Sequence, residues 1–263
     1  MKNKLKVFTT TVLFSSCLIS NAQESEKSES KFKSFFTDNI EYQAKLQLTL
    51  GGASPLGIPA KIRKIESFKP TNVVGLEANA TKWLNDEQKY GIRFGLKIES
   101  RAMKTQAEVK NYFTQIEDDS GARTTGYFTG HVVTRANNSY LTLPISFVWN
   151  ISEKWNFYGG FYISAAVNKS FDGYIYDGIF REGTPIGEPA TFEGTAIGIY
   201  DFSEDIRSFQ FGEQIGFEYK INPQFSISLD GSFANTSVFQ KDFEAISFKM
   251  YNLFGNLGFA YKF

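Results

Sequence analysis

Residues 209–233 read FQFGEQIGFEYKINPQFSISLDGSF, and they contain two stretches in which about every second residue is apolar. In residues 209–221, Phe, Ile and Tyr alternate with Gln, Gly, Glu and Lys, and residues 225–233 repeat the pattern with Ser and Asp. A period of two is the period of a β-strand, whose successive side chains point to opposite faces. Asn222-Pro223-Gln224 lies between them and favours a turn. The stretch therefore predicts a β-hairpin with one apolar face.

The same alternation recurs along most of the chain. Most of these segments are long enough for a tilted strand of about 9–11 residues to cross a bilayer. Together with the two stretches above they make eight segments: residues 42–50, 74–80, 90–98, 141–149, 157–167, 209–221, 225–233 and 251–263.

The connections between the segments alternate in length. Short, turn-like links at 85–88, 150–154 and 222–224 alternate with long, polar connections, which are residues 51–72, 101–138, 169–207 and 235–249. Short turns on one side and long loops on the other are typical of barrels in the outer membrane. The sequence therefore predicts an all-β fold, a transmembrane antiparallel up-and-down β-barrel of about eight strands.

A soluble β-sandwich also alternates apolar and polar residues, and its apolar face would fill a core. Aromatic residues at the segment ends favour the membrane, because such residues form girdles at both interfaces. These residues are Tyr42, Trp83, Tyr90, Trp149, Trp155, Tyr251 and Tyr261. The chain also ends in Phe263, on the same face as Tyr261. A terminal aromatic resembles the signal read by the barrel-assembly machinery, which is an expected partner.

The first 22 residues predict a secretory signal peptide. Three lysines precede an apolar stretch at 7–19, and Ser20-Asn21-Ala22 fits a small-x-small cleavage site, so we expect cleavage after Ala22. The alternative is a lipoprotein that carries its lipid on Cys17. Residues 23–39 are charged and rich in Ser and predict a flexible leader, and residues 40–263 form the predicted barrel domain.

The composition excludes several kinds of function. The formal net charge is +0, so nothing points to a nucleic-acid partner. His131 is the only histidine, which excludes a His-based metal cluster, and no cofactor or metal site is predicted. A hydrolase would need His131 as its base, with Ser120 and Asp118-Asp119 nearby in sequence. No G-x-S-x-G motif supports this, and a solvent-facing loop histidine is the favoured interpretation.

Charged residues also fall on the face that would line the lumen. Both signs occur, and a barrel of this size has room for side chains or a small ligand rather than an open channel. We therefore expect a structural ion-pair network, with a permeation pathway as the alternative. The residues are Lys45, Glu77, Arg93, Lys97, Glu99, Glu218, Lys220, Asp230 and Lys262. Glu213 is expected on the lipid face, near an interface or beside a bulge.

The two longest connections contain further strand-forming residues. Residues 106–116 and 126–133 are predicted to pair as a hairpin that projects beyond the membrane, as are residues 171–180 and 192–202. Such a hairpin would offer unpaired edges to a partner strand. The alternative is a ten- or twelve-stranded barrel in which these hairpins cross the membrane.

Three motifs resemble the PorT-like outer-membrane β-barrel family. Residues 140–145 (YLTLPI) resemble the family's YLEIPL strand, with Thr142 in place of its acidic residue. An aromatic-Gly-Gly strand follows at 157–160, and the C-terminal GFAYKF at 258–263 also matches. The resemblance implies an outer-membrane barrel of about eight strands and carries no catalytic residues with it.

The leading functional hypothesis is a non-enzymatic barrel that acts through its extracellular loops as a binding or envelope-structural component. Its expected partners are outer-membrane lipid and an extracellular or envelope protein. The alternatives are a narrow channel or transporter for small solutes, a secretion-associated barrel of the PorT type, and a loop-based hydrolase that uses His131.

Overall fold

A computed structural model describes residues 37–71, 74–117 and 121–263. The predicted signal peptide and nearly all of the predicted leader lie outside these residues. Residues 41–263 form one compact unit, built from antiparallel strands. The strands are β1 (Ile40–Pro55), β2 (Ile62–Thr71), β3 (Val74–Trp83), β4 (Tyr90–Glu117), β5 (Arg123–Asn150), β6 (Trp155–Asn168), β7 (Phe171–Glu182), β8 (Pro189–Phe192), β9 (Gly198–Asp201), β10 (Phe209–Lys220), β11 (Phe225–Ser237) and β12 (Met250–Lys262).

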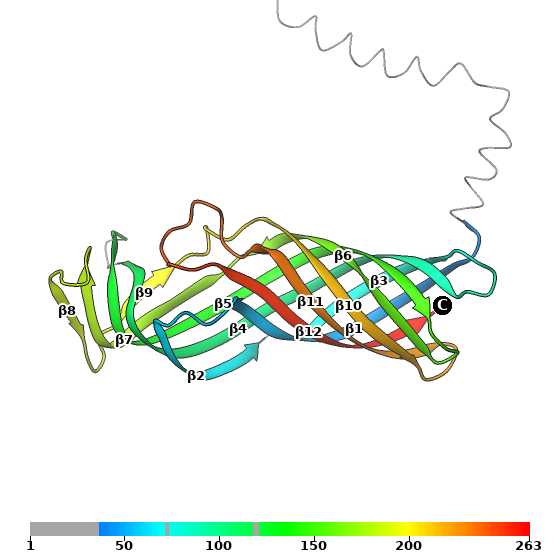
Figure 1. Cartoon of the computed structure of the whole chain (residues 1–263), viewed down its shortest axis with the longest axis horizontal. Coiled ribbons are helices and arrows are strands. Elements are labelled where there is room, and N and C mark those ends of the chain that lie inside the picture. The colour runs from blue at the N-terminus through cyan, green and yellow to red at the C-terminus, as the bar shows by residue number, and fades with distance from the viewer. Residues whose placement is uncertain (1–36, 72–73, 118–120) are drawn as a thin grey trace, which may run out of the picture. The chain divides into compact units, whose positions relative to one another are not determined.

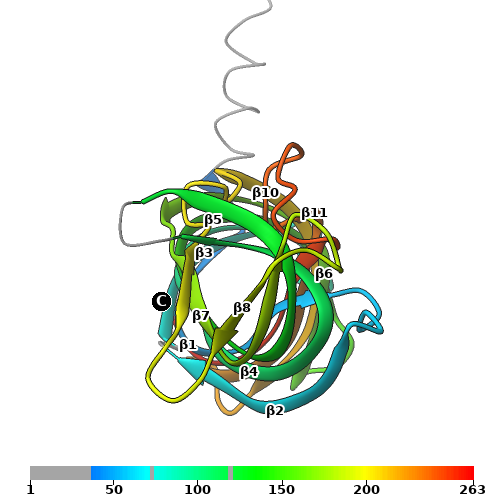
Figure 2. The ribbon, with the colours of Figure 1, turned by 90° about the vertical axis from the view of Figure 1, so that its left-hand side faces the viewer.

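Strand pairing closes the sheet into a barrel (Figures 1 and 2). The closed ring runs through β1, β3, β4, β5, β6, β10, β11 and β12, and β12 pairs back onto β1. The predicted short turns join β3 to β4, β5 to β6 and β10 to β11. The described residues form twelve strands, so the expected count of about eight is not confirmed for the sheet as a whole. The additional strands arise because the long connections fold as strands as well.

The two faces of the ring are reversed relative to a soluble sheet. Leu46, Leu48 and Leu50 of β1 are 51%, 46% and 53% exposed, whereas Gln47 and Thr49 between them are 1% and 3% exposed. The other ring strands repeat this pattern. A soluble monomer rarely exposes so large an apolar surface to water. The hydrocarbon core of a bilayer, in contrast, favours outward-facing apolar side chains. The soluble β-sandwich alternative is therefore wrong.

Aromatic side chains mark the end of the barrel at which the short turns lie. Tyr90 stacks on Phe147 with ring centroids 5.9 Å apart, and Trp155 packs on Tyr219 at 4.9 Å. Trp83 was expected in the same girdle, but it points into the lumen and donates to Glu41 at 3.1 Å. An indole takes the inward position here because a buried carboxylate accepts its N–H.

The terminal residue completes the last strand. The backbone N–H of Phe263 donates to the carbonyl of Tyr42 at 3.0 Å, across the β12–β1 pair that closes the ring. Its ring packs edge-on against Tyr261 and is 78% exposed. The terminal aromatic is therefore displayed on the outer surface.

Strands β4 and β5, each 28 residues long, continue far beyond the ring. Their pairing runs from Tyr90 opposite Trp149 to Glu117 opposite Arg123, with one irregularity between Val109 and Tyr112. β7 pairs with the outer part of β5, and β8 and β9 pair with β7 (Figure 1). The predicted hairpins are confirmed as pairings, and they extend the barrel rather than join its ring. Long connections of outer-membrane barrels are typically extracellular, so we expect this part of the structure, which we call the extracellular extension, to face outward from the cell.

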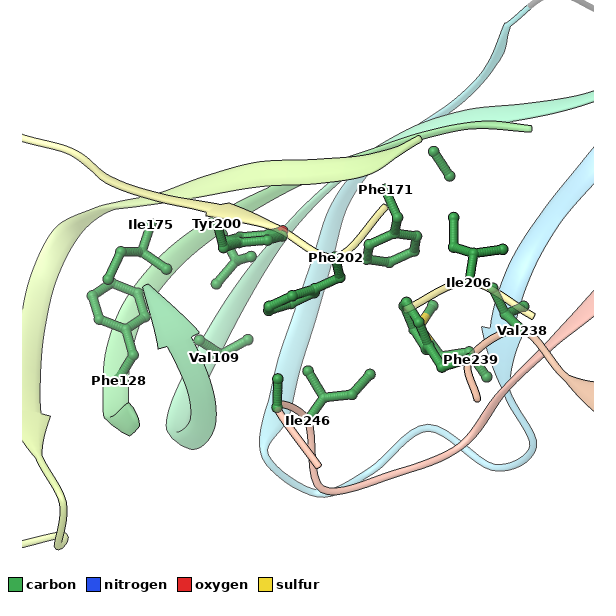
Figure 3. Close-up of a cluster of buried hydrophobic side chains, with 14 of the residues drawn as sticks. Val109, Phe128, Phe171, Ile175, Tyr200, Phe202, Ile206, Val238, Phe239 and Ile246 are labelled. Atoms are coloured by element: carbon green, nitrogen blue, oxygen red, sulfur yellow. The ribbon is translucent and has the colours of Figure 1, made fainter. Parts of the chain in front are cut away.

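The interior of the extension is apolar (Figure 3). Phe128, Ile175 and Ile206 are fully buried there. Val238, Phe239, Ala245 and Ile246 come from the connection between β11 and β12 and join the same cluster. That connection was expected to be a polar loop, but its apolar residues fold inward over the mouth of the barrel because burial removes them from water.

Candidate functional site

Paired charges fill the lumen of the ring. The Lys45 ammonium lies 2.6 Å from the Glu77 carboxylate and 3.8 Å from Asp230. Asp230 also accepts hydrogen bonds from the Tyr158 hydroxyl at 2.9 Å and the Asn256 amide at 2.8 Å. These groups come from β1, β3, β6, β11 and β12, so the network links opposite sides of the barrel wall.

A second part of the network surrounds Glu99. Its carboxylate accepts from the Arg101 guanidinium at 2.7 Å and from the Thr142 hydroxyl at 3.2 Å, and it pairs with Lys97 at 3.1 Å. Arg101 also lies 4.7 Å from the ring centroid of Tyr140, a cation–π arrangement. Sequence analysis missed Arg101, because its position was assigned to a loop.

The remaining lumen residues follow the predicted pattern. Arg93 pairs with Glu218 at 3.0 Å. Lys262 pairs with Glu41, and Lys220 donates to the side chain of Asn150 at 3.3 Å at the end of the barrel that carries the short turns. The predicted structural network is therefore present. Each buried cation has an anionic partner, as buried charges require.

Between this network and the extension, the structure contains an apolar cavity of about 360 Å³. β1, β2, β4 and β12 contribute most of its lining, including Gly52, Ile62, Phe68, Met103 and Met250. The volume falls within the range of about 300–1000 Å³ that is typical of small-molecule sites. Ile58, Ile65 and Phe68 also line it and are 60%, 49% and 48% exposed, so the cavity reaches the surface beside them.

Strand pairing explains why the cavity opens at this place. Among the described strands, β3 pairs with both β4 and β1, whereas β2 pairs with β4 alone. The wall beside β2 is therefore completed by side chains instead of a continuous backbone ladder. A Cβ atom at Gly52 would lie 2.6 Å from the Met103 sulfur and 3.1 Å from the Phe68 ring. A side chain at residue 52 would have to displace Met103 and Phe68, so glycine allows these two cavity-lining side chains to lie against β1.

Tyr112 and Tyr200 contribute phenol groups to the cavity, beside hydroxyls of serine and threonine. The Tyr200 hydroxyl donates to the carbonyl of Val133 at 2.9 Å and lies 2.7 Å from the Thr134 hydroxyl. Burial raises the pKa of Tyr200 and of Tyr112 well above the usual range of a phenol. Both phenols are therefore neutral near pH 7, and the cavity is uncharged.

The candidate hydrolase residues do not assemble into a site. His131 lies on the outer face of the extension, with its Nδ1 3.2 Å from Glu66 and its ring 5.3 Å from Tyr176. Within the described part of the chain, no serine hydroxyl bonds to this ring. Asp118, Asp119 and Ser120 lie outside the described residues. No group of three or more His, Cys, Asp or Glu side chains able to hold a metal occurs among the residues described.

Glu213 faces outward, as expected, and is hydrogen-bonded by the side chain of Asn235 at 3.1 Å. The register of β10 is continuous here, with Glu213 opposite Phe161 and Phe233, so no bulge displaces it. The amide partner reduces the cost of placing a carboxyl group among apolar side chains.

The closed ring, its apolar outer face and its polar lumen define an integral β-barrel protein of the outer membrane. The chain matches the family described as "Outer membrane protein beta-barrel domain" over residues 21–240, and it belongs to this family. No curated protein matches it. In the described part of the chain, no helix has the length and apolar character needed to span a bilayer.

Several solved structures are similar to the chain. The attachment invasion locus protein Ail of Yersinia pestis is 11% identical, with 85% of this chain and 97% of that chain covered and a TM-score of 0.35. Neisserial surface protein A is 10% identical, with 86% and 97% covered and a TM-score of 0.30. The outer membrane protease OmpT of Escherichia coli is 10% identical, with 86% and 94% covered and a TM-score of 0.32.

Proposed function

We propose that this protein is a non-enzymatic binding component of the outer membrane that acts through its extracellular β-structure. Its ligand is an apolar molecule or acyl chain that enters the cavity beside β2. The observation that carries the proposal is the cavity of about 360 Å³, lined by Gly52, Phe68 and Met103 above a lumen filled with paired charges.

The chemistry of the cavity favours an apolar ligand. An engineered apolar cavity of about 150 Å³ stays dry and binds benzene, so a larger one has room for a larger molecule. The exposed side chains of Ile58, Ile65 and Phe68 at the mouth lie near the outer end of the lipid-facing band, where Leu50 and Leu253 are 53% and 55% exposed. A ligand dissolved in the outer leaflet would reach the mouth without crossing water.

The lumen argues against a narrow channel. A solute would have to separate ion pairs such as Lys45–Glu77 and Arg101–Glu99, which are buried and short. Separating a buried pair leaves uncompensated charge, which is strongly unfavourable. The hypothesis of a secretion-associated role is supported only by the resemblance to the PorT-like family. An extracellular or envelope protein partner is proposed for the outer face of the extension.

A photoactivatable fatty acid tests the proposal in native outer membranes. We expect light-dependent labelling of the full-length protein, with the adduct on residues that line the cavity. Gly52→Leu, whose side chain would have to displace Met103 and Phe68 at the cavity wall, should abolish labelling at that site. Ala107→Phe on β4, another lining position, provides a second block if Gly52→Leu assembles poorly.

Gly231→Leu is the matched control, because nothing lies within 4 Å of a Cβ at that glycine. It adds the same volume outside the cavity and should leave the labelling unchanged. Labelling that persists in both cavity variants would overturn the proposed ligand site.

A further inference from the structure

Three cations form a ladder across the outer face, at the base of the extracellular extension. Lys69 of β2 is the direct partner of Lys104 in β4, and Lys104 is the direct partner of Arg135 in β5. All three side chains are exposed, and they alternate with inward-facing neighbours such as Met103 and Ala136. Directly opposed residues have Cβ atoms about 4.5–5.5 Å apart.

The ladder is only partly neutralised. Arg135 pairs with Asp172 at 2.5 Å. In the part of the chain that the structure describes, neither Lys69 nor Lys104 has a carboxylate within ion-pair distance. Like charges directly opposite each other destabilise a sheet. An arrangement that costs stability and leaves two ammonium groups free is suited to an external anion.

The order of side chains along the same strands indicates what kind of anion. Toward the membrane from the ladder lie the hydroxyls of Ser100 and Ser139, whose oxygens are 3.3 Å apart. The next outward-facing pair in that direction is Ile98 and Leu141, which face the lipid. Above the ladder come aromatic side chains: Tyr176 lies 5.8 Å from Tyr174 and 5.3 Å from His131.

We propose that this outer face binds the headgroup of a phosphorylated glycolipid of the outer leaflet. Its acyl chains lie against the apolar band, its phosphates contact Lys69 and Lys104, and its sugars pack on Tyr174 and Tyr176. The apolar row is followed by the cationic and aromatic rows, as the acyl chains of such a lipid are followed by a headgroup of phosphates and sugar rings. Ammonium groups bind phosphate as point charges, and aromatic faces suit the apolar faces of sugar rings. The surface is independent of the cavity.

The test uses the full-length protein in mixed micelles of a zwitterionic detergent, titrated with fluorescent diphosphoryl lipid A. The double variant Lys69→Gln/Lys104→Gln should weaken binding about tenfold, because two exposed charge contacts are lost. Binding by the natural chain should also weaken as salt is raised. Lys154→Gln, an exposed lysine in the turn between β5 and β6, is the matched control and should bind normally.

Unchanged affinity in the double variant, or an equal loss in Lys154→Gln, would overturn the proposal. So would equal affinity of the natural protein for phosphatidylglycerol, which carries phosphate without the sugars. The double variant should be at least as heat-stable as the natural chain, since like-charge repulsion is removed. A fall in its unfolding midpoint would instead assign the lysines a structural role. Gly52→Leu should keep full lipid A affinity, so the two proposals can fail separately.

Discussion

Replacing Glu99 with Gln would test whether the lumen network holds the barrel closed. Glu99 is 1% exposed and accepts from Arg101 and Thr142 while pairing with Lys97. Glutamine keeps the shape and one acceptor oxygen. The substitution removes the only negative charge among the described residues that lies within 4 Å of Arg101 and Lys97. Two buried cations would then face a neutral amide.

The expected loss is large because the charges that remain are buried. Removing one partner of a buried ion pair costs about 3–5 kcal/mol, and the acceptor oxygen that Gln retains places Glu99→Gln near the lower end, at about 3 kcal/mol. Adding Arg101→Met should recover part of this loss. A thioether in that position would pack against the rings of Tyr140 and Tyr162, which the guanidinium now contacts.

Urea unfolding in lipid vesicles, followed by tryptophan fluorescence, measures these free energies. Glu117→Gln is the control, because Glu117 pairs with Arg123 at 3.8 Å on the exposed tip, where a pair contributes about 0–1 kcal/mol. If Glu99→Gln cost no more than Glu117→Gln, the lumen would have to be hydrated and the argument for a closed barrel would be refuted.

Three further outcomes follow from the closed ring. Phe263→Asp should lower the amount of protein in the outer membrane, because we expect the exposed aromatic side chain of Phe263 to help the last strand to be recognised; normal levels would contradict this role. The natural protein should migrate as a compact species in SDS unless heated, since a closed ladder leaves no edge in the ring, and migration independent of heating would count against closure. In planar bilayers it should give no stable open-channel steps, because paired charges fill the lumen, and regular steps would revive the channel hypothesis.

Much of the ring could be predicted because each strand has lipid on one face and the polar lumen on the other. Its side chains therefore alternate regularly between apolar and polar. Residues 42–50 alternate without interruption, and residues 209–221 do so except at Glu213, so both their strand character and their inward-facing charges follow from a period of two. Lys45, Glu77 and Glu218 were assigned to the lumen on this basis, and the structure pairs all three.

Other parts could not be predicted from the same signal. β2 contains two irregularities in its register with β4, so its residues do not alternate cleanly. Residues 238–249 pack into the core as an irregular segment, whose apolar positions have no period at all. Trp83 was grouped with the girdle residues because it lies at a strand end, but the period of two places it on the same face as Glu77 and Thr81, and it is 2% exposed and bonds to Glu41. The cavity depends on β2 and on residues 238–249 and was therefore missed.

The edges of the predicted hairpins were expected to accept a partner strand. In the structure β4 is covered by β2, so a free edge of the extension belongs to β2, and its chemistry argues against partner pairing. The strand carries Lys64, Lys69 and Pro70, and Pro70 has no backbone N–H to offer. β8, at the other end of the sheet path, is only four residues long and begins with Pro189. Lysine, proline and short length are the means by which natural sheets prevent edge pairing. Recognition by the extension is therefore expected on its faces rather than at its edges.

The position of the cavity follows from a reversal within a single strand. In β4, Leu96 and Ile98 face outward into lipid while Lys97 and Glu99 are buried, but a few residues later Met103 and Val109 are buried and Lys104 is exposed. Between these positions the surroundings of the outer face change from hydrocarbon to water. The outward-facing residues therefore change from apolar to polar, and the inward-facing residues from polar to apolar. Below the reversal long charged side chains fill the interior, and above it phenylalanine and isoleucine do. The apolar cavity lies at the junction between these two parts of the interior. Its wall there includes the small residues Gly51, Gly52, Ala53 and Ala107.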